Sequence, residues 1–179
     1  MGKKARFRNK GDKMNNFYAK TILYAYRNLD AVTRQLDDLV LKRALASMND
    51  LSPCETQCEK ILSLTDQKDV LINLKLVTKS VVDKFTEDEK DYLDYKYFKL
   101  KPKEYYADFD FTSRAYFRKQ VRVADKFAKR LEKAGITDEY FEDKCLSIEF
   151  FRELLKRVTE RENNFSKQKD ASVSVKISA

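Results

Sequence analysis

Histidine is absent from this 179-residue chain, and glycine and proline are scarce, with three and two copies. Without histidine the chain lacks the commonest general base, the commonest metal ligand and the usual pH switch of proteins. It also has no glycine-rich phosphate loop and no nucleophile at a useful spacing from a base, so we expect no enzyme activity. Because β-sandwiches and barrels need many turns, and turns consume glycine and proline, the shortage of both predicts an all-α fold.

Cysteine is also rare, and its three copies are Cys54, Cys58 and Cys145. An odd number of thiols argues against a disulfide framework. Cys54 and Cys58 lie four residues apart on one face of an expected helix. Zinc takes four ligands, however, and only Cys145 and a carboxylate could complete that set. We therefore interpret the thiols as structural or incidental, and we expect neither a bound metal nor a cofactor.

Long apolar runs are missing as well. None approaches the roughly 20 residues that a membrane-spanning helix requires. The basic N-terminus is not followed by the apolar segment of a secretory signal. We therefore expect a cytoplasmic protein without a membrane partner.

Positive charge is in excess, with 37 Lys and Arg against 29 Asp and Glu, a formal net charge of +8. A basic protein of this kind often binds a polyanion such as nucleic acid. Residues 1–14 carry six cations and one acid with few large apolar groups, which predicts a flexible basic arm. The arm is either a contact to the DNA backbone or a solvated terminus.

The region 15–84 is expected to be helical. Residues 15–51 contain no Gly or Pro and place apolar residues at a three-four spacing, which predicts one long amphipathic helix. Ser52 and Pro53 interrupt it. A short helix with Cys54, Cys58, Ile61 and Leu62 facing inward should follow, and then a second helix capped by Thr65 or Asp66. This region is predicted to bind a partner, to form a homo-oligomer, or to fold against the helices of 138–160.

The region 85–135 has the layout of a helix-turn-helix. Thr86 and Glu89 form a capping box, and a short helix is expected from Pro102 to about Asp108. A basic helix of about 22 residues should then run from a cap at Thr112 or Ser113 to Gly135. Its expected buried stripe is Phe117, Val121, Ala124, Ala128 and Leu131, with Phe127 beside them. Its other faces carry eight cations against two acids, a net charge of +6.

This region also resembles region four of bacterial sigma factors, and resembles still more the small phage regulators of the ArpU and RinA type. The resemblance rests on Phe85-Thr86-Glu87-Asp88-Glu89 at a Leu-Thr-x-x-Glu helix start, on Tyr106-Ala107-Asp108, and on Ser113-Arg114 at the opening of the recognition helix. The chain departs from the pattern at Asp110, where an apolar residue is common, and at Phe111, where a turn glycine is common.

The resemblance implies a sequence-selective, duplex DNA-binding transcriptional regulator. It places the DNA contacts on the start of the basic helix, at Thr112, Ser113, Arg114, Arg118, Lys119, Arg122 and Lys126. RNA polymerase is a candidate partner for residues 15–84 if these do not form an oligomer. Two alternatives stay open: a small subunit of a phage terminase, which packages DNA, and a helical protein-interaction module that binds no nucleic acid.

The C-terminal residues are expected to form two short elements and a tail. Thr137 and Ser147 should cap helices within 136–162. Residues 163–179 read as a flexible tail, in which Val173 to Ile177 alternate like a strand.

Overall fold

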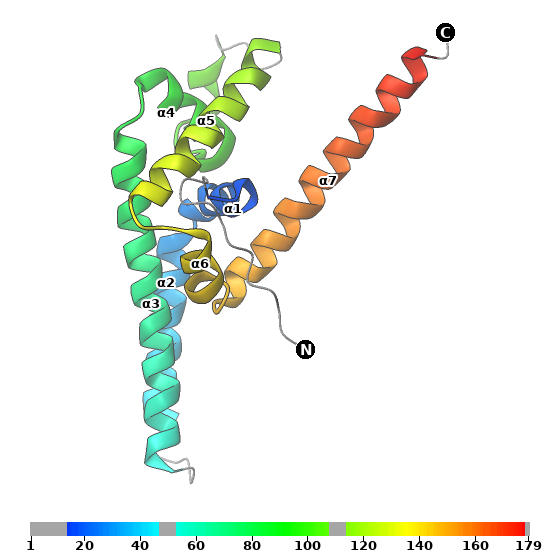
Figure 1. The fold of residues 1–179 in the computed structure, drawn as a ribbon. Coiled ribbons are helices and arrows are strands. Elements are labelled where there is room, and N and C mark those ends of the chain that lie inside the picture. The colour runs from blue at the N-terminus through cyan, green and yellow to red at the C-terminus, as the bar shows by residue number, and fades with distance from the viewer. Residues whose placement is uncertain (1–13, 47–52, 108–113, 178–179) are drawn as a thin grey trace.

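The computed structural model describes residues 14–46, 53–107 and 114–177, with side chains up to residue 164 (Figure 1). Within these ranges every regular element is a helix, which confirms the expected all-α fold. Of the predicted basic arm, residues 1–13 lie outside the described ranges. Met14, which we expected at the end of that arm, is buried in the core.

The helix expected over 15–51 is two helices, so that prediction was wrong. Helix α1 spans Asn16–Tyr26 and α2 spans Leu29–Ala46. Between them the Asn28 N–H donates to the Ala25 carbonyl at 2.8 Å, which closes a turn. The turn leaves α1 in the core and directs α2 out of it. The side chains of Ile22, Leu23 and Leu29 on both sides of the turn are fully buried.

Two helices were expected after Pro53, and the structure has one. Helix α3 runs unbroken over 30 residues, Cys54–Asp83, and forms an antiparallel hairpin with α2. The Thr65 hydroxyl donates to the Ile61 carbonyl within the helix, at 3.1 Å, so it caps nothing. Cys54, Cys58 and Leu62 are exposed, in contrast to the inward orientation that we expected.

The segment before the basic helix contains three short elements: α4 (Glu87–Leu93), a π-helical turn (Asp94–Phe98) and a 3-10 helix (Lys103–Tyr106). The capping box of α4 is present as predicted, with both reciprocal hydrogen bonds between Thr86 and Glu89. The 3-10 helix stands where a helix from Pro102 to about Asp108 was expected. Residues 108–113 lie outside the described ranges.

The basic helix, α5, spans Arg114–Lys133. It ends as predicted, because Gly135 has a φ of +89°, a conformation that favours glycine. The C-terminal elements are α6 (Asp138–Tyr140), a second π-helical turn (Phe141–Cys145) and α7 (Glu149–Ile177).

Two expectations for the C-terminal region need correction. Thr137 caps α6 as predicted, but the Ser147 hydroxyl donates to the Lys144 carbonyl at 2.6 Å instead of capping the next helix. Helix α7 continues to Ile177, in place of the tail and the strand-like stretch that we expected. No Gly or Pro interrupts the chain between Ile136 and Ile177, so the backbone has no barrier to continuing the helix.

Helix α1 lies at the centre of the molecule, between α5 and the first turns of α7 (Figure 1). The Tyr18 ring stacks on Phe141 with 4.6 Å between centroids, and Lys20 pairs with Glu162 at 2.6 Å. Residues 15–84 were predicted to bind a partner, to form a homo-oligomer or to pack against the C-terminal helices. For α1 the structure shows packing against the C-terminal helices.

Candidate nucleic-acid interface

The side of helix α5 that faces the core agrees with the predicted stripe in the second half of the helix and differs from it in the first half. Its buried residues are Val123, Ala124, Phe127, Ala128 and Leu131. Phe117 and Val121, which we expected to be buried, are 46% and 62% exposed. The predicted stripe was therefore wrong in the first half of the helix, where the half-buried Tyr116 takes the inner position, 5.1 Å from the Tyr92 ring.

The first two turns of α5 pack on the core through the half-buried Tyr116, whereas their opposite side faces solvent, and the first fully buried side chain of the helix is Val123. Arg114 and Arg118 are exposed on these turns, and Arg122 follows one turn later. The N-terminal end of the helix therefore presents long cationic side chains to solvent.

Five cations form what we call the basic face: Arg114, Arg118, Arg122, Lys129 and Lys133. At 3.6 residues per turn these positions fall on the side of the helix away from Phe127 and Leu131. All five are exposed, and within the described parts of the chain none of them has an ion-pair partner. The positive charge of this face is consequently available to an external anion.

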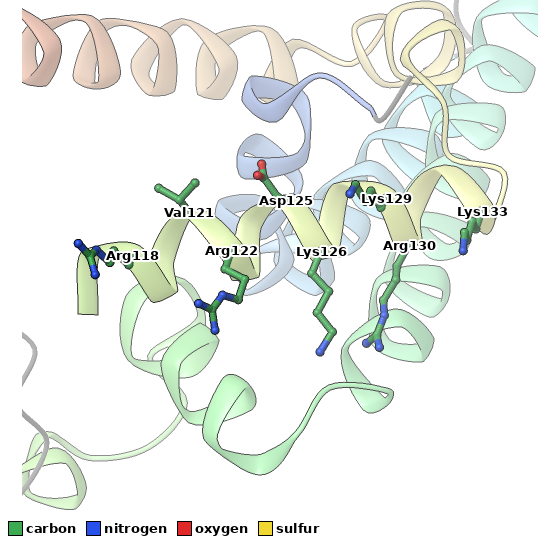
Figure 2. A pocket seen from close by; sticks show the side chains of 8 residues that line it. All are labelled: Arg118, Val121, Arg122, Asp125, Lys126, Lys129, Arg130 and Lys133. Carbon is green, nitrogen blue, oxygen red and sulfur yellow. The ribbon is translucent and has the colours of Figure 1, made fainter. Parts of the chain in front are cut away.

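The basic face borders a shallow surface depression of about 650 Å³ (Figure 2). Its lining is cationic except for two residues, Val121 and Asp125. Asp125 accepts a hydrogen bond from the Asn16 side chain at 3.1 Å, which ties this face to the start of α1. The full lining is Arg118, Val121, Arg122, Asp125, Lys126, Lys129, Arg130 and Lys133.

Two of the predicted DNA contacts are engaged within the protein. The Lys126 ammonium lies 2.8 and 2.6 Å from the two carboxylate oxygens of Glu89, and Lys119 pairs with Asp88. Burial opposes ionisation of Glu89, but the hydrogen bonds from Lys126 and Thr86 outweigh it and lower the pKa of this carboxyl. These pairs join α5 to the start of α4.

Arg130 reinforces the same junction. Its guanidinium lies 4.4 Å from the centroid of the Phe85 ring, and the Lys126 ammonium lies 4.9 Å from it. Asp88 and Glu89 of α4, together with the Phe85 ring, therefore cover the side of α5 that lies between its core-facing side and its basic face.

A buried carboxylate organises the chain ahead of α5. Asp94, 6% exposed, accepts hydrogen bonds from the backbone N–H groups of Leu100 at 2.9 Å and Lys101 at 3.0 Å, and from the Tyr106 hydroxyl. These bonds satisfy the buried charge without a cation. They hold the 3-10 helix against the end of α4.

The predicted site is therefore partly assembled. Arg114, Arg118 and Arg122 lie on the basic face, Lys119 and Lys126 lie at the junction with α4, and Thr112 and Ser113 lie outside the described ranges. Sequence reasoning left Lys129 and Lys133 out of the site. Lys129 and Lys133 lie on the same side of the helix as Arg118 and Arg122. This helical spacing would have added them to the predicted site if the core-facing side of the helix had been known.

Two further findings concern metal sites within one chain and membrane spans. No group of three or more Cys, Asp or Glu residues there is placed to hold a metal ion. No helix in the same ranges is long and apolar enough to span a membrane. Comparisons with family models, with curated proteins and with solved structures find no match to this chain.

Proposed function

We propose that this protein binds duplex DNA through the basic face of α5 and acts as a sequence-selective transcriptional regulator. The observation that carries the proposal is the basic face itself: five exposed cations without an ion-pair partner in the described ranges, on a helix whose opposite side is anchored in the core. Neutralisation of backbone phosphates supplies most of the affinity of such a surface for DNA.

The dimensions of α5 suit a groove. A helix with its side chains is about 10–12 Å wide, and the major groove is about 12 Å wide. Arg114 and Arg118 are exposed on the side of the first two turns that faces away from Tyr116, and this side supplies the groove-reading end. An arginine bonded to both acceptors of a guanine discriminates that base by about 1–3 kcal/mol.

The other end of the basic face supports phosphate contacts. Lys129 lies about 17 Å along the helix axis from Arg118, at 1.5 Å per residue. Lys129 and Lys133 therefore reach a different part of the duplex from Arg114 and Arg118. Lysine is a point-charge ligand for phosphate and carries little base specificity.

Salt dependence of binding tests the proposal. If Arg122, Lys129 and Lys133 contact phosphates, the logarithm of the affinity should fall with the logarithm of salt concentration at a slope of about −2.7, from roughly 0.9 per contact. Fluorescence anisotropy with a labelled duplex over about 50–200 mM salt measures that slope. The double variant Lys129→Ala/Lys133→Ala should reduce its magnitude by about 2.

A charge-matched control separates the basic face from net charge. Lys42 and Lys60 are exposed on the α2–α3 hairpin, away from α5, so Lys42→Ala/Lys60→Ala should leave the slope unchanged. An equal loss in both double variants, or no binding to any duplex at about 50 mM salt, would refute the proposal. Selection from random duplexes should show that Arg118→Ala relaxes the preferred sequence, whereas Lys133→Ala weakens all sequences alike.

The same purified protein can be used to test the two alternative functions and the proposed RNA polymerase partner. A ring of many subunits in light scattering favours the terminase small subunit, whereas a monomer or dimer favours the regulator. Absence of salt-dependent DNA binding favours the interaction module. RNA polymerase is the protein partner that the proposal implies, and co-sedimentation of polymerase with the chain on a selected duplex is its test.

A further inference from the structure

The α2–α3 hairpin extends from the body of the molecule as a two-helix arm (Figure 1). No described residue beyond Leu36 on α2, or before Leu71 on α3, is buried. The outer half of the arm therefore contributes nothing to the core and leaves large apolar side chains in solvent. Leu41, Leu45 and Leu62 are 60%, 58% and 60% exposed.

Two thiols stand at the outer end of this arm. Cys54 and Cys58 lie on the first two turns of α3, both are exposed, and their sulfur atoms are 4.0 Å apart. With zinc–sulfur bonds of about 2.3 Å, tetrahedral geometry places neighbouring sulfurs about 3.8 Å apart. The pair is therefore already close to the spacing of two ligands of one zinc ion.

One chain cannot complete the coordination from the described residues. A structural zinc site has four protein ligands, and no third Cys, Asp or Glu joins the pair in the described ranges. The sequence contains no histidine, and the remaining thiol, Cys145, is buried in the body of the molecule. The described residues therefore supply only two of the four ligands, and a second copy of this chain brings the same pair.

We propose that Cys54 and Cys58 of two copies of this chain bind one Zn²⁺ and join the two hairpin arms at their outer ends. Four thiol S–H bonds break and four Zn–S bonds form, and the four protons go to solvent. Because both thiols of each chain are exposed, a second arm can approach without rearrangement of the core.

The exposed leucines favour a second arm as the occupant. Asp30 pairs with Lys75, and Asp37 pairs with Lys68 at 2.5 Å. This register places Leu45 about level with Lys60, near the thiols, and Leu41 about level with Leu64. Exposed leucines thus lie near the end of the arm that carries the metal ligands, and pairing of two arms would remove them from water. The inference does not depend on DNA binding.

Mass and metal content test the proposal on the full chain. The protein is prepared with a phosphine reductant, stripped of metal with a chelator, and then titrated with Zn²⁺. In light scattering the mass should double from 21.1 kDa, and elemental analysis should find one zinc ion for two chains. With Co²⁺ in place of Zn²⁺, a thiolate-to-metal charge-transfer band should appear.

Substitutions identify the side chains that bind the metal and those that join the two chains. Cys54→Ser/Cys58→Ser should abolish the mass change and the Co²⁺ band, whereas Cys145→Ala, the matched control, should keep both. Leu45→Glu should weaken pairing while the thiols remain. One zinc ion for each monomeric chain, a mass unchanged by Zn²⁺, metal binding that survives the double serine variant, or a disulfide with no affinity for zinc would each overturn the proposal.

Discussion

The orientation of α5 has a direct test in the two phenylalanines of that helix. Phe127 is fully buried and Phe117 is 46% exposed. Phe127→Ala removes a buried ring and leaves a cavity, which should lower the free energy of unfolding by about 3–5 kcal/mol. Phe117→Ala should lower it by about 1 kcal/mol, roughly half of the 1.5–3 kcal/mol for burying a Phe side chain, and no enclosed cavity adds to that loss.

Urea unfolding followed by far-UV circular dichroism measures both values. The dependence of the unfolding free energy on urea should be the same in both variants, which shows that the change is one of stability. If Phe117→Ala costs as much as Phe127→Ala, then Phe117 faces the core and α5 is rotated. Arg118 and Arg122 would then leave the basic face, and the proposed DNA contacts would fail with them.

Three further predictions follow from buried or paired groups. Asp94→Ala leaves the Leu100 and Lys101 N–H groups without an acceptor and should cost about 1–3 kcal/mol of stability in urea unfolding, whereas Asp143→Ala, which breaks an exposed pair with Lys144, should cost under about 1 kcal/mol. The pKa of Glu89 is lowered on folding, so its stabilisation is present above its unfolded pKa and is lost as pH falls through the folded value. The stability difference between wild type and Glu89→Gln should therefore shrink between about pH 7 and about pH 3, and a constant difference would contradict this assignment. An aromatic disulfide reagent should titrate Cys54 and Cys58 rapidly and Cys145 only on unfolding, because burial raises the pKa of Cys145 to about 12.

The sequence predicted correctly those helix ends that depend only on a few neighbouring residues. The capping box at Thr86 and the cap at Thr137 were predicted because each helix start depends on hydrogen bonds within three residues. Gly135 was predicted because its positive φ is a property of one residue.

Breaks and continuations of helices were not predictable in the same way. The turn at Arg27 and Asn28 has no Gly or Pro to announce it. It exists because α1 is buried among other helices while α2 leaves the core to pair with α3. Thr65 has the side chain of a helix cap, but its hydroxyl bonds back to Ile61 within a helix that the pairing with α2 keeps continuous.

The amino-acid sequence by itself determined that this protein is helical and that its excess positive charge is concentrated in residues 114–133. Both follow from composition and from the spacing of residue types along the chain. Only the tertiary structure decided which of those cations face solvent. Lys119 and Lys126 are paired with Asp88 and Glu89, which lie 31 and 37 residues away in the chain, and a contact at such a separation depends on how α4 packs against α5 and has no periodic signal in the sequence.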